Sequence, residues 1–193
     1  MDNIHKFSGR MGNEMFRHAY LYAQTRKGII PEWYLQDPKW FDGFEDEIKK
    51  MFSEGIGYLD QVGVHIRRAN NPTVPSEPKY SENPFYINIS ETDYYERAMS
   101  LFPDDNFLVF SDDPEWCREK FKDNPRVQVM DKGDEVEDFN LLASCKSLII
   151  ANSSWSWWAG YLCPTESKRV IAPSKWFADG IQRVGIPKEW IQI

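Results

Sequence analysis

The sequence predicts an α/β protein built on a Rossmann-like parallel sheet. From residue 60 onward, short runs of branched and aromatic residues alternate with helical segments of about ten residues. One of these runs, SLIIA at 147–151, is almost continuously apolar, as expected of a central parallel strand buried on both faces. Several predicted strands end in charged or hydroxyl-bearing residues. Open parallel sheets bind their ligands beyond these carboxyl ends.

The first sixty residues contain one clear helical pattern. Residues 9–28, GRMGNEMFRHAYLYAQTRKG, read as a glycine turn followed by an amphipathic helix. Gly28 is expected to end this helix, and a short strand at 4–7 is expected to precede the turn. Residues 31–60 are aromatic and acidic and show no clear periodicity.

Beyond residue 60, strands and helices alternate in a regular order. The expected strands are residues 61–66, 106–111, 126–130, 147–151 and 169–173. The expected helices are residues 92–102, 113–121, 135–145 and 155–163. Asp113 is expected to cap its helix, with Pro114 in the favoured first position. Residues 70–90 carry four prolines and read as a long loop, and loops of that length are usually functional or disordered.

Composition and charge exclude several classes of function. Hydrophobic residues make up 41% and charged residues 27% of the 193 residues, as in ordinary soluble globular proteins. A net charge of -7 argues against nucleic acid and anionic membranes as partners. The sequence has no apolar run of roughly 20 residues and no secretory signal pattern at its N-terminus. A cytoplasmic protein without a transmembrane segment is therefore expected.

Three cysteines, Cys117, Cys145 and Cys163, are widely spaced, with no C-x-x-C pattern and no nearby histidine pair. This spacing favours buried or free thiols in a reducing compartment over disulfides or zinc ligands. Aromatic residues reach 15% of the chain, which suits either sugar contacts or an aromatic core.

The stretch NSSWSWWAGYL, which begins at Asn152, combines serines and tryptophans where a helix is expected to begin. Hydroxyl and N–H groups at a helix N-terminus can bind an anion, which makes Ser153 and Ser154 candidate phosphate contacts. Plain helix capping by either serine is the alternative. Trp155 and Trp158 are three residues apart and are expected to pack against the sheet.

Charged residues follow two neighbouring strands. HIRR closes the strand at 61–66 with Arg67 and Arg68, and a guanidinium group presents a rigid fork to phosphate oxygens. A salt bridge at the end of the sheet is the alternative. The segment SDD follows the next strand, and because Asp113 is expected to cap a helix, Asp112 is the carboxylate available to a ribose or a guanine.

The glycine turn GRMGN is a fourth candidate segment. Gly9 and Gly12 would let a backbone approach closely, because glycine has no side chain to obstruct it. Arg10 and Asn13 would supply polar contacts there.

These segments together resemble the α-1,2-fucosyltransferases of bacteria and eukaryotes, which use GDP-fucose. The blocks that carry the resemblance are GRMGNEMFRHA (9–19), VGVHIRR (62–68), FLVFSDDPEWCREKF (107–121) and DFNLLASCKSLIIANSSWSWWAGYL (138–162). The resemblance implies a glycosyltransferase of the GT-B type, with residues 1–60 as a reduced acceptor-side lobe and residues 61–193 as the GDP-sugar-binding lobe. It also implies inverting transfer of fucose from GDP-fucose to a glycan acceptor, α-1,2 to galactose, without a metal or other cofactor.

The resemblance also assigns residues to roles. Arg67 would contact the donor pyrophosphate and carry the catalysis, and Asp112 would face the nucleoside. The other residues expected to bind the donor are His65, Asn152, Ser153, Ser154, Arg10, Gly12 and Asn13. No prediction of oligomeric state follows.

One departure from the family pattern affects the chemistry. The family usually has Gly-Asp after the arginine pair, whereas this chain has Ala69 and Asn70. Asparagine cannot accept a proton, so a general base would come from elsewhere, such as Glu14 or an acidic residue of 31–60. Two alternatives stay open: a protein that binds a nucleotide sugar without transferring it, and a transferase that uses another GDP-sugar.

Overall fold

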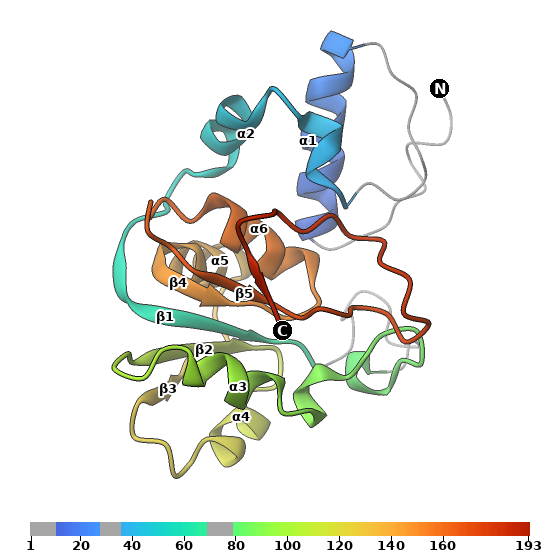
Figure 1. Cartoon of the computed structure of the whole chain (residues 1–193). Helices are drawn as coiled ribbons and strands as arrows, with labels where there is room; N and C mark the ends of the chain where they lie inside the picture. Colours follow the sequence, from blue (N-terminus) through green and yellow to red (C-terminus); the bar gives the residue numbers. More distant parts are fainter. Residues whose placement is uncertain (1–10, 28–35, 69–78) are drawn as a thin grey trace.

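Six parallel strands form one sheet in the order β3-β2-β1-β4-β5-β6 (Figure 1). The strands are β1 (Leu59–Ile66), β2 (Phe107–Ser111), β3 (Val127–Val129), β4 (Cys145–Ile149), β5 (Val170–Ala172) and β6 (Ile191–Gln192). This is the strand order of the Rossmann fold, which confirms the predicted α/β class and parallel sheet. The two-residue strand β6 was not foreseen from the sequence.

The computed structural model describes residues 11–27, 36–68 and 79–193. The expected strand at 4–7 and the expected helix end at Gly28 lie outside these residues. So do Arg10 and Asn70.

Helices cover both faces of the sheet (Figure 1). One face packs against α3 (Tyr94–Ser100) and α4 (Pro114–Lys120), and the other against α5 (Glu135–Ser144) and α6 (Ser154–Leu162). Two further helices, α1 (Met11–Lys27) and α2 (Glu45–Phe52), lie beyond α5 and α6. Short 3-10 turns occupy Pro38–Phe41, Tyr80–Glu82 and Ile89–Glu91.

The apolar run around β4 serves both faces of the sheet. Leu148 and Ile150 pack toward α5 and α6, whereas Ile149 and Ala151 pack toward α3 and α4. Successive side chains of a strand point to opposite faces, so a strand covered on both sides must be apolar throughout. The continuous run SLIIA follows directly from this position at the centre of the sheet.

The N-terminal helix packs on the same core as α6. The ring of Phe16 lies 4.7 Å from that of Trp157 and 4.8 Å from that of Trp158, measured between centroids. Phe41 and Ile48 from the following segments join this cluster. The division of the chain at residue 60 stays a prediction.

Side-chain capping explains where α4 begins, whereas Asp93, the N-cap residue of α3, makes no such bond. Asp113 accepts a hydrogen bond from the backbone N–H of Trp116 at 3.3 Å, and Pro114 stands in the first turn of α4, as predicted. Helix α3 begins at Tyr94, two residues later than expected. Thr92 there accepts from the N–H of Tyr94 at 3.3 Å.

All three cysteines are buried and none forms a disulfide, which confirms the prediction of free, buried thiols. No helix within 11–27, 36–68 or 79–193 is long and apolar enough to cross a membrane.

Burial should make these thiols slow to react in the folded protein. Loss of hydration raises the pKa of Cys117 to about 11 and that of Cys145 to about 12, so little reactive thiolate exists near neutral pH. We expect iodoacetamide to label the native protein slowly at about pH 8 and to label all three cysteines once urea unfolds it. Intact-mass spectrometry would follow the labelling, and rapid modification of Cys117 or Cys145 in the native protein would contradict their burial.

Candidate functional site

The chain reverses its direction across the sheet between β1 and β4. From β1 it continues through β2 to β3 on one side, and from β4 through β5 to β6 on the other. Such a reversal opens a crevice at the carboxyl ends of the two central strands, where α/β proteins bind ligands. Arg67 follows β1 directly, and the serines Ser153 and Ser154 follow β4 and open α6. Residues predicted from separate segments therefore follow the ends of two neighbouring strands.

An ion pair ties the end of β1 to the end of β2. The register pairs Ile66 with Ser111, which sets Arg67 beside Asp112. Nη1 of Arg67 bonds to Oδ2 of Asp112, and Oδ1 of Asp112 accepts from the backbone N–H of Arg68 at 2.8 Å. The two side chains are only 10% and 11% exposed. The salt bridge raised as the alternative for the arginines is therefore present, and Asp112, expected to be available to a ribose or a guanine, has both carboxylate oxygens bonded within the protein. The pair also orients the guanidinium of Arg67.

Arg68 is held by the protein on several sides. Its guanidinium lies 4.0 Å from the ring centroid of Trp116. Nη1 donates to Ser90 at 2.5 Å and to Glu91 at 2.8 Å, and Nε donates to Asp113 at 3.4 Å. Trp116 and Glu91 were not foreseen, because neither stands at a strand end in the sequence. These contacts fix the segment around residue 90 to the start of α4.

The first turn of α1 rests directly on the start of α6. The hydroxyl of Ser154 donates to Oδ1 of Asn13 at 2.9 Å, and Gln36 donates to the same oxygen at 2.6 Å. A Cβ atom on Gly12 would lie 2.5 Å from the backbone carbon of Ser154 and 2.6 Å from the nitrogen of Trp155. Gly12 and Asn13 thus lie within α1 and not in the expected glycine turn, and the close approach of Gly12 is to protein backbone. Only glycine allows this contact.

Replacing Gly12 by alanine is expected to destabilise the protein. The added methyl group meets backbone atoms, which cannot rotate away, so α1 must shift from α6. Overpacking of this kind typically costs about 1–3 kcal/mol in the free energy of unfolding. Urea unfolding would measure the loss. Gly57→Ala is the matched control, because its Cβ would make an ordinary contact at 3.8 Å. Equal stability of the two variants would contradict the close approach.

The side chains of His65 and Trp155 pack against each other between β1 and α6. The side chain of His65 is buried, and its ring centroid lies 4.7 Å from that of Trp155. The half-buried Trp155 also meets Phe139 of α5 at 5.6 Å. The carbonyl of His65 accepts from the hydroxyl of Tyr95 at 2.9 Å, which anchors the end of β1 to α3.

The other two tryptophans of α6 belong to the core. Trp157 and Trp158 are completely buried. Trp158 is thus buried as expected, but its ring meets Phe16, Phe41 and Phe52 from α1, the 3-10 turn and α2, and not the sheet as predicted. Burial of Trp157 was not foreseen, and its indole N–H donates to the carbonyl of Gly185 at 2.9 Å.

The polar residues before α6 make specific contacts. Nδ2 of the buried Asn152 donates to the carbonyls of Ile87 and Trp176 at 2.9 and 3.0 Å. Ser153 stands at the N-cap position but forms no side-chain capping bond, and the hydroxyl of Ser154 bonds to Asn13. Simple capping, the alternative raised for these serines, therefore does not explain them.

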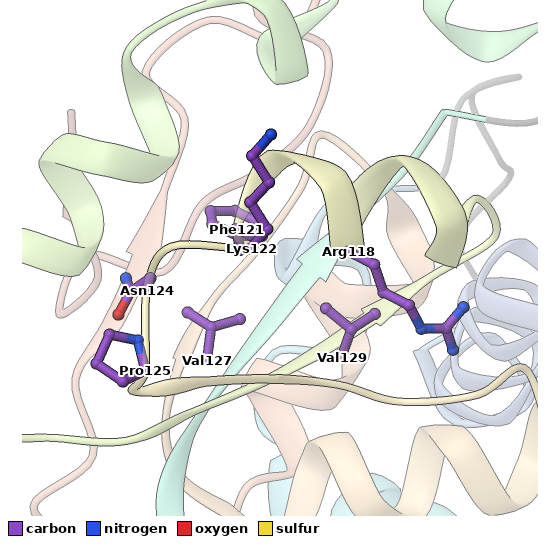
Figure 2. A pocket seen from close by; sticks show the side chains of 7 residues that line it. All are labelled: Arg118, Phe121, Lys122, Asn124, Pro125, Val127 and Val129. Carbon is purple, nitrogen blue, oxygen red and sulfur yellow. The ribbon is translucent and has the colours of Figure 1, made fainter.

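A surface pocket of about 360 Å³ lies elsewhere, between α4 and the edge strand β3 (Figure 2). Its lining residues are Arg118, Phe121, Lys122, Asn124, Pro125, Val127 and Val129. Both cations there already pair with carboxylates, Arg118 with Asp131 and Lys122 with Glu119. None of the predicted site residues lines this pocket.

Metal ligands are not grouped in the described part of the chain. Within it, no cluster of three or more histidine, cysteine, aspartate or glutamate side chains could hold an ion. The groups that follow β1 and β4 are Arg67 and Arg68, both of which already pair with carboxylates, and the N-terminus of α6, whose N–H groups suit an anionic ligand.

A six-stranded parallel sheet in this order defines a Rossmann-like protein. The particular family is identified by sequence comparison. The chain belongs to glycosyl transferase family 11, whose sequence profile matches residues 32–193.

Several curated relatives share this similarity. The O-antigen biosynthesis glycosyltransferase WbnK of Escherichia coli is 28% identical over 88% of this chain and 62% of its own length. An alpha-1,2-colitosyltransferase of Escherichia coli is 31% identical over 75% of this chain and 51% of its own length. The galactoside alpha-(1,2)-fucosyltransferase 1 of Saimiri sciureus is 33% identical over 52% of this chain and 28% of its own length. The chain thus spans less than two thirds of the length of each of these relatives.

Proposed function

We propose that the protein transfers fucose from GDP-fucose to a hydroxyl group of a galactoside, forming an α-1,2 linkage with inversion and without a metal. The observation that carries the proposal is the position of Arg67 directly after β1 and of the serine-rich start of α6 after the neighbouring strand β4, in a chain of family 11. The name of a galactoside alpha-(1,2)-fucosyltransferase among the relatives supports the transferred sugar, the acceptor class and the linkage. The GT-B architecture, with residues 1–60 on the acceptor side, is part of the same proposal.

The chemistry requires stabilisation of a leaving group. Breaking the bond between fucose and diphosphate leaves negative charge on GDP and positive charge on the sugar. Arg67 and the N–H groups that open α6 supply positive charge at the crevice without a metal ion. Asp112 keeps the guanidinium of Arg67 oriented, so little reorganisation is needed when the diphosphate binds. His65 and Trp155 pack together between the end of β1 and the start of α6.

The transfer reaction itself is the test. The protein would be incubated with GDP-fucose and a panel of β-galactosides, and both the released GDP and the mass of the product would be measured. We expect GDP release coupled to a product heavier by one deoxyhexose. GDP binding without any consumption of GDP-fucose would refute fucose transfer.

A second candidate is transfer of another GDP-linked sugar. It is favoured by the relative named as an alpha-1,2-colitosyltransferase, because groups that hold a diphosphate do not read the sugar attached to it. Turnover of a different GDP-deoxysugar by a protein that leaves GDP-fucose intact would establish this candidate in place of the first.

Transfer should survive removal of divalent cations. Arginine and a helix N-terminus are expected to neutralise the leaving diphosphate, which is the task of Mg²⁺ or Mn²⁺ in metal-dependent enzymes. Initial rates with and without EDTA should therefore agree within about twofold, because no charge stabilisation is lost. Activity abolished by EDTA and restored by Mn²⁺ would show that the charge is stabilised in another way.

A further inference from the structure

A second surface adjoins the start of α6. The loops of residues 85–87 and 176–178 run antiparallel, joined by backbone hydrogen bonds, and lie side by side (Figure 1). Asn152 donates to one carbonyl of each loop, those of Ile87 and Trp176. The paired loops are therefore fixed directly to the residue that precedes the serines of the candidate donor site.

The paired loops carry an exposed aromatic ring, that of Phe85. Phe85 is 43% exposed, whereas Phe177 beneath it is 1% exposed. The ring centroid of Phe85 lies 5.1 Å from that of Phe177 and 5.0 Å from that of Tyr86. The guanidinium of Arg183 lies 5.3 Å from the ring of Phe85 and 5.0 Å from that of Phe177. Phe85 thus combines a fixed position with a large accessible surface.

A charged pair borders the ring. Both terminal nitrogens of Arg183 donate to the carboxylate of Asp179, at 2.6 and 2.9 Å. Asp179 also accepts from the backbone N–H of Ile181 at 3.0 Å. These hydrogen bonds, above all that from Arg183, lower the pKa of Asp179 to about 2, so the carboxylate remains charged at neutral pH. Hydrogen-bonding groups of both kinds therefore lie beside an aromatic face.

This combination matches one face of a pyranose ring. The C–H groups of a sugar pack on the electron-rich face of an aromatic ring, and its hydroxyl groups bond at the edge to a carboxylate and a guanidinium. The backbone limits how far Phe85 can lie from Asn152. Asn152 is bonded to Ile87, and the two residues from Ile87 to Phe85 span at most about 7 Å. A sugar on Phe85 would therefore lie next to a donor held at the start of α6.

We propose that Phe85, Asp179 and Arg183 form the subsite for the acceptor sugar, a terminal β-galactose. This assignment rests on the proposed function. It deepens that function by naming the surface that holds the acceptor. The donor residues and the acceptor subsite then lie on either side of Asn152, which joins them.

Binding of methyl β-galactoside in the absence of any donor tests the subsite. Saturation-transfer NMR would compare the wild-type protein with Phe85→Ala and Asp179→Asn. Loss of the stacking ring should weaken binding by roughly two- to tenfold. Tyr58→Ala is the matched control, because Tyr58 is 62% exposed and precedes β1 at the opposite end of the sheet, and it should bind as the wild type does.

Calorimetry with GDP separates the subsite from the donor site. Phe85→Ala and Asp179→Asn should bind GDP as the wild type does, with circular dichroism confirming the fold of each variant. Three results would overturn the subsite: no galactoside binding by the wild type, equal binding by the wild type and both variants, or loss of GDP affinity in the variants. Self-association abolished by Phe85→Ala, without galactoside binding, would assign the surface to a second copy of the chain. Failure of the wild type to bind GDP, with galactoside binding intact, would instead count against the proposed function.

Discussion

Replacing Arg67 by alanine is expected to lower kcat/KM for fucose transfer at least about a hundredfold, because removal of one well-placed charge-stabilising group typically costs about 10²–10³ in rate. Arg67 stands at the carboxyl end of β1, and Asp112 holds its guanidinium in place. Steady-state kinetics with GDP-fucose and a galactoside would give the ratio. The same variant should also bind GDP more weakly, since the diphosphate is its expected partner.

Two further variants make this result specific. Arg67→Lys keeps the positive charge and loses the two-point fork, so its activity should fall between those of the wild type and Arg67→Ala. Asn70→Ala should cost far less than Arg67→Ala, because an asparagine cannot serve as a general base. Equal damage from Asn70→Ala, in a protein with an intact fold, would show that position 70 takes part in the chemistry.

Replacing Trp158 by alanine is expected to reduce the free energy of unfolding by about 3–5 kcal/mol, the usual cost of removing a large buried aromatic side chain. Trp158 is completely buried, and its ring stacks on Phe41 at 5.6 Å and meets Phe16 at 4.8 Å. The loss would therefore loosen α6 from α1 and from the 3-10 turn at Pro38–Phe41. Urea unfolding followed by circular dichroism would measure it.

Trp155→Ala is the natural comparison on the same helix. Trp155 is half-buried and lies against His65, at the wall of the crevice. Trp155→Ala should lower the free energy of unfolding less than Trp158→Ala does. It should weaken GDP binding more than Trp158→Ala does. A loss below about 1 kcal/mol for Trp158→Ala would contradict its place in the core, since buried tryptophans rarely cost so little.

The sheet could be predicted because its pattern is local. Each long strand can be recognised from its branched and aromatic residues. Strands β1, β2 and β4 begin and end within about two residues of their predicted bounds, which is the usual uncertainty of element ends. Strand β6 has two residues, and pairing with β5 alone defines it. Helix α2 was missed because it buries only Ile48 within an otherwise polar and exposed segment.

The candidate site could be predicted only in part, because its partners are distant in sequence. HIRR and SDD both indicated charged strand ends, but only the register of β1 and β2 sets Arg67 beside Asp112. The contact of Asn13 with Ser154 joins residues 141 positions apart, and no local pattern reveals it. The stacking of Arg68 on Trp116 likewise depends on how α4 packs on β2 and β3.

Calorimetric titration of the protein with GDP and with UDP tests the proposed donor site most directly. Arg67 and the start of α6 would bind the diphosphate of either nucleotide, while the guanine would donate to Asp112, whose oxygens can each accept a second hydrogen bond beside those from Arg67 and Arg68. GDP should therefore bind with measurable heat and raise the melting temperature, and UDP should bind more weakly. Absence of both heat and thermal shift at millimolar GDP would contradict a GDP-sugar site at the switch point of this sheet.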